Sequence, residues 1–303
     1  MHDLIIIGAG PSGLTAAIYA GRFRLNALVL EKMAPGGQIL LSPSIENYPG
    51  FPEGIPTFEL MDKFKKQVES LGLRIEDKEA LEVLPQGKFY QVKTPGENFE
   101  TKAVIIAAGA KPKRLGVKGE DKFTGRGVSY CGTCDGPLFR DKGIVIVGGG
   151  DRAIEDAIFL AGYAKSVHLV HRRDEFRAAE ILVDKLRKNS RVKFVMDSVV
   201  EELCGENKVE SAKLKNVKTL GRSEIKCDGV FIFVGILPDT AFVKNILETD
   251  ESGFIITDKT MRASRDGVFA CGDCVSKSLY QVVNACGEGA LAADSAYKYL
   301  ARI

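Results

Sequence analysis

The sequence has no marked excess of charge of either sign. Its 303 residues contain 42 Lys and Arg against 40 Asp and Glu, which gives a formal net charge of +2. Proteins that bind nucleic acid or anionic membranes by general electrostatic attraction carry a clear basic excess. The composition therefore gives no reason to expect either kind of partner.

Long apolar segments are also absent. No apolar run approaches the ~18 residues that a membrane-spanning helix requires, and the segment Met1–Ile7 lacks the parts of a secretory signal. We therefore expect a cytoplasmic protein without a membrane partner. At ~100–200 residues per domain, the length predicts two domains, each with its own core.

Cysteine is too sparse in this long chain for a disulfide-stapled scaffold. Four of the seven cysteines form two C-x-x-C pairs, Cys131/Cys134 and Cys271/Cys274. In a reducing compartment this spacing indicates redox or metal chemistry rather than a structural bridge. A zinc site that uses both pairs is disfavoured, because zinc ribbons place the second pair only ~12–20 residues after the first.

A nucleotide-binding unit is predicted at the N-terminus. The apolar run Leu4–Ile7 leads into Gly8-Ala9-Gly10-Pro11-Ser12-Gly13, a helical segment follows, and a second apolar run ends at Glu31. Such glycines allow a tight turn and let a pyrophosphate approach the helix N-terminus, while the acid binds a ribose hydroxyl. A tight turn without a ligand is the alternative, and the placed strand, helix and acid argue against it.

The same pattern returns in the middle of the chain. The run Gly143–Val147 precedes Gly148-Gly149-Gly150-Asp151-Arg152-Ala153, and the next predicted strand is Ser166–Val170. The two units align without a gap, so that His171 replaces Glu31 and is followed by Arg172, Arg173 and Arg177. Arginines attract the 2′-phosphate that a carboxylate would repel, so this site is predicted to prefer NADP over NAD. An exposed basic patch is the alternative.

The pair in Cys131-Gly132-Thr133-Cys134 lies just ahead of the second unit, and Asp135 follows it. The spacing allows a small disulfide ring and shared thiolate character, and the carboxylate is placed to exchange protons. An inert buried pair is the alternative. Hydride chemistry needs a nicotinamide and a thiol acceptor needs a flavin intermediary, so two dinucleotide sites beside this pair predict a flavin-dependent oxidoreductase.

The remaining cysteines receive a different interpretation. In Cys271-Gly272-Asp273-Cys274 the middle residues suit contact with phosphate or ribitol, so Asp273 is interpreted as functional and the cysteines as incidental. A second redox pair is the alternative. Cys204, Cys227 and Cys286 are expected to pack as small buried hydrophobes.

The assembled motifs resemble the low-molecular-weight thioredoxin reductases, which are FAD-dependent pyridine nucleotide–disulfide oxidoreductases, over essentially the whole chain. Beyond the two glycine turns, the carriers are Pro35-Gly36-Gly37-Gln38, Glu46–Pro52, Ile106–Ala110, Cys131–Gly136, His171–Arg177 and Gly272-Asp273. The resemblance implies an α/β fold with two Rossmann-like three-layer dinucleotide-binding domains. The FAD domain would comprise residues 1–114 and 244–303, the NADPH domain with the cysteine pair would be inserted as 115–243, and the protein would be a homodimer.

The resemblance also implies roles for individual residues. FAD would be bound by Gly8, Gly10, Pro11, Ser12, Gly13, Glu31, Gly37, Gln38, Asn47, Ala108, Gly109, Gly272, Asp273 and Gln281. NADPH would be bound by Gly148, Gly150, Asp151, Arg152, Ala153, Arg172, Arg173 and Arg177. Cys134 would face the flavin, Cys131 would attack the disulfide of a thioredoxin-like or glutaredoxin-like protein, and Asp135 would relay the proton. The inserted domain would rotate between two arrangements.

Some positions depart from the family pattern. Arg152 stands where a small Ser or Thr is usual, Tyr280 stands where Arg is common, Ala108 replaces a Thr, and Leu138 replaces an aromatic residue. Arg152 and Tyr280 leave open a donor other than NADPH, such as ferredoxin or a deazaflavin.

Three rival functions are a small-molecule dithiol oxidase, a peroxide-linked disulfide reductase and a flavoprotein sensor without turnover. The peroxide-linked reductase is disfavoured, because its extra N-terminal redox domain is lacking. The sensor is disfavoured, because the cysteines, Asp135 and the arginines are intact.

Overall fold

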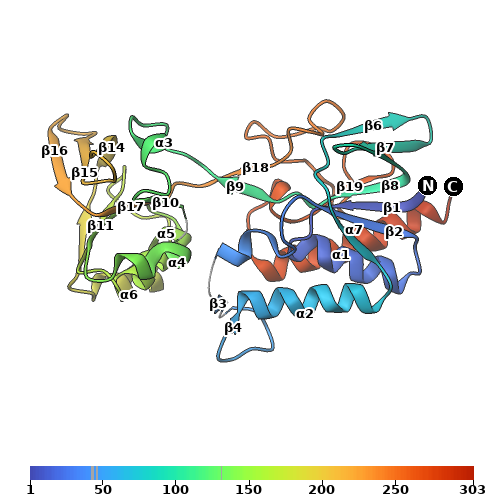
Figure 1. Cartoon of the computed structure of the whole chain (residues 1–303), viewed down its shortest axis with the longest axis horizontal. Coiled ribbons are helices and arrows are strands. Elements are labelled where there is room, and N and C mark those ends of the chain that lie inside the picture. The colour runs from blue at the N-terminus through green and yellow to red at the C-terminus, as the bar shows by residue number, and fades with distance from the viewer. Residues whose placement is uncertain (42–43, 46, 131) are drawn as a thin grey trace. The chain divides into compact units, whose positions relative to one another are not determined.

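The computed structural model describes residues 1–41, 44, 45, 47–130 and 132–303. At positions 41, 44, 133 and 134 it describes only the backbone. The chain divides into two compact units (Figure 1). The first unit is built from both ends of the chain, Met1–Lys111 and Leu237–Ile303, and the second is the middle segment, Pro112–Ile236. Both crossings lie in short strands, β9 (Ala110–Pro112) and β18 (Ile236–Pro238), which pair as a two-stranded sheet.

The first unit has a seven-stranded sheet. Along the sheet the strands are β5 (Arg74–Asp77), β2 (Ala27–Glu31), β1 (His2–Ile7), β8 (Asn98–Ile106), β7 (Phe89–Lys93) and β6 (Glu82–Gln86), and β19 (Val268–Ala270) also pairs with β8. The pairs that join β5, β2, β1, β8 and β19 are parallel, whereas β6, β7 and β8 are antiparallel neighbours. The run Leu4–Ile7 is buried on both faces, which explains why its apolar residues are continuous rather than alternating.

Three layers make up this unit. The helices α1 (Pro11–Arg22), α2 (Thr57–Ser70) and α7 (Val282–Leu300) cover one face of the parallel strands (Figure 1). On the other face, the β6–β7 hairpin and the segment 243–275 supply a second apolar cluster.

The second unit repeats this plan. Its parallel sheet has the order β10 (Val128–Ser129), β17 (Gly229–Phe233), β11 (Gly143–Gly148), β12 (Ser166–Val170) and β13 (Val192–Val195). The helices α5 (Asp151–Leu160) and α6 (Glu180–Arg187) pack against this sheet, and their buried side chains form an apolar cluster with those of the strands. The antiparallel strands β14 (Ser198–Cys204), β15 (Ser211–Asn216) and β16 (Arg222–Lys226) contribute to the other cluster.

The two predicted β-α-β units are therefore confirmed as β1-α1-β2 and β11-α5-β12, each at the centre of a sheet with the same order. Gly8 has a φ of +107°, and a Cβ atom at Gly13 would overlap the Gly8 carbonyl oxygen. These contacts explain why the turn between β1 and α1 requires glycine at both positions.

Short elements complete the chain. They are the 3₁₀ turns η1 (Gly37–Leu41), η2 (Gly136–Phe139) and η3 (Gly272–Cys274), the hairpin β3 (Ser44–Ile45) and β4 (Ile55–Pro56), and the one-turn helices α3 (Glu120–Phe123) and α4 (Gly132–Asp135). Among the described helices, none has the length and apolar character needed to cross a membrane.

Candidate active site

The turn between β1 and α1 forms the candidate nucleotide site of the first unit. Glu31, at the end of β2, accepts hydrogen bonds from the N–H groups of Ala9 (2.6 Å) and Met33 (3.0 Å). Its carboxylate thus reaches back to the glycine turn, where a ribose is expected. A Cβ atom at Gly10 would approach no other atom closer than 4.0 Å, so the helix N-terminus is open to a phosphate.

Three further segments of the first unit meet at this turn. Gly272 packs so closely on the Ser12 side chain that a Cβ atom there would overlap Oγ, and one at Gly37 would lie 3.1 Å from the Gly10 Cα. Asp273 lies beside Gly272 and is half-buried. Ala108 and Gly109 follow β8, which is a direct neighbour of β1. The residues predicted to bind FAD are therefore gathered at the carboxyl edge of one sheet.

Asn47 and Gln281 are also brought together. The Asn47 side-chain Nδ2 donates a hydrogen bond to Gln281 Oε1 (3.0 Å), although the two residues come from opposite ends of the chain. Gln38 is exposed on η1. Glu46 lies outside the described residues.

A buried ion pair at this edge was not predicted. Glu288 of α7 accepts hydrogen bonds from the Gly272 N–H (2.8 Å) and from Lys277 Nζ (2.7 Å), and both side chains are about nine-tenths buried. Lys277 also lies 3.7 Å from Asp273. The signal available in the sequence was the single acid in the otherwise small and apolar segment Val282–Ala293.

The turn between β11 and α5 forms the corresponding candidate nucleotide site of the second unit. Ala153 is buried, and a Cβ atom at Gly148 would lie 2.6 Å from its Cβ. At Gly150, in contrast, a Cβ atom would meet nothing within 4 Å, so this helix N-terminus is also open. Asp151 Oδ1 accepts a hydrogen bond from the Ala179 N–H (2.7 Å), directly before α6.

The three predicted phosphate-binding arginines are exposed next to this turn. The Arg177 N–H donates to the Gly149 carbonyl (2.8 Å), which fixes the segment 172–177 beside the turn. His171 is buried under Gly149 and stacks on Phe176, and burial lowers its pKa, so it contributes no charge at neutral pH. Within the described residues, Arg172, Arg173 and Arg177 form no ion pair, which leaves their guanidinium groups available to an anion.

The redox motif lies on α4. Cys131 is outside the described residues, and Cys134 is considered only as part of the α4 backbone. Asp135 is half-buried at the end of α4. Two side chains of α5 approach the motif: Arg152 Nη2 donates to the Tyr130 carbonyl (3.2 Å), and Asp156 packs against Gly132. Arg152 thus extends toward the redox motif.

Comparison with known proteins agrees with this arrangement. A family model described as pyridine nucleotide-disulphide oxidoreductase matches residues 2–289. A thioredoxin reductase of Listeria monocytogenes is 42% identical over 301 residues, which cover 99% of this chain and 94% of that protein. The chain belongs to the thioredoxin reductase family.

Solved structures of the family extend the comparison. The thioredoxin reductase of Lactococcus lactis has a TM-score of 0.97 and 41% identity, with full coverage of both chains. A ferredoxin-flavin thioredoxin reductase of Clostridium acetobutylicum has a TM-score of 0.55 and 35% identity, and the match covers 100% of this chain and 99% of that one. Membership of the family implies a flavin and a pyridine nucleotide, and the two open glycine turns fit two dinucleotides.

The second C-x-x-C pair is buried in the first unit. Cys271 and Cys274 are completely inaccessible free thiols, and Cys274 Sγ lies 3.5 Å from the Ile106 carbonyl oxygen. Burial raises the pKa of both thiols, that of Cys274 to about 11, which disfavours the thiolate that redox exchange needs. The prediction of burial is confirmed for Cys227 and wrong for Cys204 and Cys286, which are only half-buried. Cys204 is the last residue of β14, and Cys286 lies near the start of α7.

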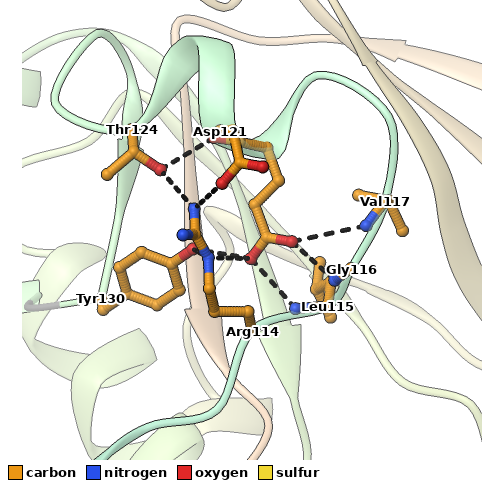
Figure 2. Close-up of polar contacts among 8 residues, drawn as sticks. Arg114, Leu115, Gly116, Val117, Asp121, Thr124 and Tyr130 are labelled. Atoms are coloured by element: carbon orange, nitrogen blue, oxygen red, sulfur yellow. Dashed lines mark hydrogen bonds and ion pairs between the residues drawn. The ribbon is translucent and has the colours of Figure 1, made fainter.

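A second polar cluster, also not predicted, surrounds Glu120 in the inserted unit. Figure 2 labels the residues that surround Glu120. The Glu120 side chain is almost fully buried and accepts hydrogen bonds from the Leu115 (3.0 Å) and Gly116 (2.6 Å) N–H groups. The Tyr130 hydroxyl donates to the same carboxylate (2.6 Å), and Arg114 Nε donates to that hydroxyl (3.2 Å). The cluster thereby fixes the residue that directly precedes Cys131.

Proposed function

We propose that this protein is an NADPH-dependent thioredoxin-disulfide reductase that carries electrons through FAD and the Cys131–Cys134 pair. The observation that carries this proposal is the presence of two open glycine turns of one design with different ribose-binding groups. Glu31 stands beside the first turn, and three exposed arginines stand beside the second. A carboxylate suits the ribose hydroxyls of FAD, whereas arginines suit the 2′-phosphate of NADPH.

The first unit would hold FAD. Gly8, Gly10 and Gly13 would take the pyrophosphate at the N-terminus of α1, and Asp273 would contact the ribitol or phosphate. Gly37, Gln38, Asn47, Ala108, Gly109 and Gln281 would lie along the rest of the cofactor. The contacts of Gly272 with Ser12, and of Asn47 with Gln281, support one continuous site. When bound, the flavin would accept a hydride from NADPH and pass two electrons to a disulfide.

The second unit would hold NADPH. Gly148, Gly150, Asp151 and Ala153 would form the pyrophosphate turn, and Arg172, Arg173 and Arg177 would recognise the 2′-phosphate. Arg152 belongs to the same turn in sequence. The open space at Gly150 supports access of a nucleotide although Arg152 is a long side chain.

The cysteine pair would deliver the electrons. Two electrons and two protons convert the Cys131–Cys134 disulfide into two thiols. The Cys131 thiolate then attacks one sulfur of the partner's disulfide, and the mixed disulfide that forms releases the partner's first thiolate. Cys134 attacks Cys131 Sγ, which restores the internal disulfide and releases the second thiolate. Asp135 would exchange the protons.

The partner would be a thioredoxin-like or glutaredoxin-like protein with an exposed disulfide. The chain would act as a cytoplasmic homodimer, and the inserted unit would move between two arrangements during the cycle, because one pair of sulfurs must serve both the flavin and an external protein. The competing hypotheses are a donor other than NADPH, such as ferredoxin or a deazaflavin, and a small-molecule dithiol oxidase.

The test is anaerobic bleaching of the bound flavin by NADPH, NADH and reduced ferredoxin in separate stopped-flow experiments. NADPH is expected to bleach the flavin at least tenfold faster than NADH, and added oxidised thioredoxin is expected to restore the colour. Cys131→Ser and Cys134→Ser are each expected to abolish thioredoxin reduction while they leave flavin bleaching by NADPH intact. Full turnover by either serine variant would refute the proposal. Bleaching of the flavin by reduced ferredoxin but not by NADPH would show that ferredoxin is the electron donor.

A further inference from the structure

Helix α5 carries two side chains, one turn apart, that reach the redox motif. Arg152 Nη2 donates a hydrogen bond to the Tyr130 carbonyl (3.2 Å), and Arg152 Nε lies 3.8 Å from Asp156 Oδ2. The guanidinium group also lies over the Phe233 ring, 5.7 Å from its centroid. These three contacts orient the Arg152 side chain toward Tyr130, Asp156 and Phe233.

Asp156 contacts Gly132, the residue that follows Cys131 in the motif. Its side chain is 14% exposed and packs directly on Gly132. A Cβ atom at Gly132 would lie 2.5 Å from Asp156 Oδ1, 3.0 Å from Cγ and 3.2 Å from Cβ. A rotation of the Asp156 side chain would move Oδ1 and Cγ but would leave its Cβ 3.2 Å away, so a methyl group at position 132 would also require a small shift of the helix or of the motif. Glycine at position 132 and aspartate at position 156 are therefore matched in size.

The residues on either side of Cys131 in the chain are thus both held by one helix. We propose that Arg152 and Asp156 are positioning residues of the redox pair, which hold Tyr130 and Gly132 and thereby set the reactivity of Cys131 toward disulfides. The inference rests on the proposed role of Cys131 as the attacking thiol. On this proposal Arg152, which belongs to the nucleotide turn in sequence, contributes to the attack of Cys131 on the partner's disulfide.

The position of α5 gives this pair a further consequence. The helix begins directly after Gly150, where the nucleotide is expected, and its first two turns carry Arg152 and Asp156. A single rigid element therefore connects the nucleotide turn to the residues that flank Cys131. The guanidinium group is also a cation held at the Tyr130 carbonyl, and we expect such a cation to favour the thiolate form of a cysteine in the same motif.

The first test measures the thiol itself and needs neither NADPH nor thioredoxin. The holoenzyme is reduced with a phosphine, freed from excess reductant, and treated with iodoacetamide at pH 7, and the Cys131 peptide is quantified by mass spectrometry. Arg152→Ala is expected to slow alkylation of Cys131 about threefold to tenfold. Arg152→Lys, which keeps a cationic donor, is expected to remain within twofold of wild type. The control Arg187→Ala removes an exposed arginine of α6 and is expected to change nothing.

The second test uses the size match. Gly132→Ala is expected to lower kcat/KM for thioredoxin at least tenfold, and Gly132→Ala combined with Asp156→Ala is expected to return it to within threefold of Asp156→Ala alone. The KM for NADPH is expected to stay within twofold of wild type in all three variants. Far-UV circular dichroism identifies any variant that fails to fold. In that case the alkylation rates of Arg152→Ala and Arg152→Lys decide whether Arg152 has the positioning role.

The outcomes separate this inference from the proposed function. A wild-type Cys131 that resists alkylation, or a Cys131→Ser variant with full turnover, would overturn the proposed function itself. If wild-type Cys131 reacts and turnover depends on it, unchanged rates in Arg152→Ala and Gly132→Ala would overturn only the positioning role.

Discussion

Tyr130 donates its hydroxyl hydrogen to the Glu120 carboxylate across 2.6 Å, and this bond joins the residue before Cys131 to the first segment of the inserted unit (Figure 2). Glu120 also accepts hydrogen bonds from the N–H groups of Leu115, Gly116 and Val117, which lie a few residues after the connecting strand β9. One buried carboxylate therefore organises both the entry to the unit and the approach to its redox motif.

Loss of this carboxylate should weaken the inserted unit. Glu120→Gln is expected to lower the free energy of unfolding by about 2–4 kcal/mol, because several charge-assisted hydrogen bonds end on one buried group. Tyr130→Phe removes one of them and is expected to cost about 1 kcal/mol. Urea denaturation of the holoenzyme measures both. The control Asp121→Asn affects a neighbouring, 90% exposed carboxylate and is expected to stay within about 0.5 kcal/mol.

The pH dependence of Glu120 follows from the same contacts. Burial by itself would raise the pKa of Glu120, but the Tyr130 hydroxyl and the three N–H groups outweigh burial and lower it below the usual 4.5. Its contribution to stability is therefore present above pH 4.5 and is lost as the pH falls further. The stability difference between wild type and Glu120→Gln should shrink below that pH. A difference that grew on acidification would contradict this assignment.

Asp156 should show the opposite behaviour. Burial raises its pKa from 3.8 to about 6, Arg152 partly opposes the rise and Glu155 adds to it. The unfolded chain ionises before the folded one, so wild type loses stability as the pH rises from 3.8 through 6. The free energy of unfolding of Asp156→Asn minus that of wild type should therefore be about 2 kcal/mol larger at pH 7.5 than at pH 4.5. Urea denaturation at both pH values measures this difference, and the control Asp184→Asn on α6 should show no such change.

The exposed arginines should determine the choice of nucleotide. Arg172→Ala combined with Arg173→Ala is expected to raise the KM for NADPH about 10–100-fold, because two solvent-exposed charged contacts to a phosphate are together worth about 1.5–3 kcal/mol. The KM for NADH should change less than twofold. Steady-state reduction of thioredoxin with each nucleotide measures the ratio, and equal losses for both nucleotides would count against recognition of a 2′-phosphate. Arg187→Ala is the matched control.

The buried cysteines should be silent in catalysis. Cys274→Ala is expected to retain at least half of wild-type turnover and to destabilise the first unit by about 1–2 kcal/mol through the small cavity that it leaves. In the native enzyme a thiol reagent should leave Cys271 and Cys274 unmodified, and both should react after denaturation. Rapid modification of either thiol in the native enzyme would instead support a second redox pair.

Local signals were sufficient for much of the architecture. The runs Leu4–Ile7 and Gly143–Val147 with their glycine turns predicted both β-α-β units, because a central parallel strand must be apolar throughout and its turn must lack side chains. The cysteine spacing and the arginines after His171 could also be recognised from the sequence, because each of these signals lies within a few consecutive residues.

The contacts that join distant segments could not be inferred in this way. Burial of Glu120 beneath Tyr130, the ion pair of Lys277 with Glu288, and the packing of Asp156 on Gly132 all join residues whose approach depends on how helices and loops pack. The half-burial of Cys204 and Cys286 likewise depends on how the end of β14 and the start of α7 pack, which hydrophobicity alone does not predict.

The sequence by itself therefore determined the repeated dinucleotide-binding design and the chemistry of its motifs, because period, glycine spacing and charge are local properties. Only the tertiary structure decided the direction in which Arg152 extends. Its position in the nucleotide turn is set by the chain, and Asp156 is its neighbour one turn along the same helix. The Tyr130 carbonyl comes within reach of its guanidinium group only because α5 packs against α4.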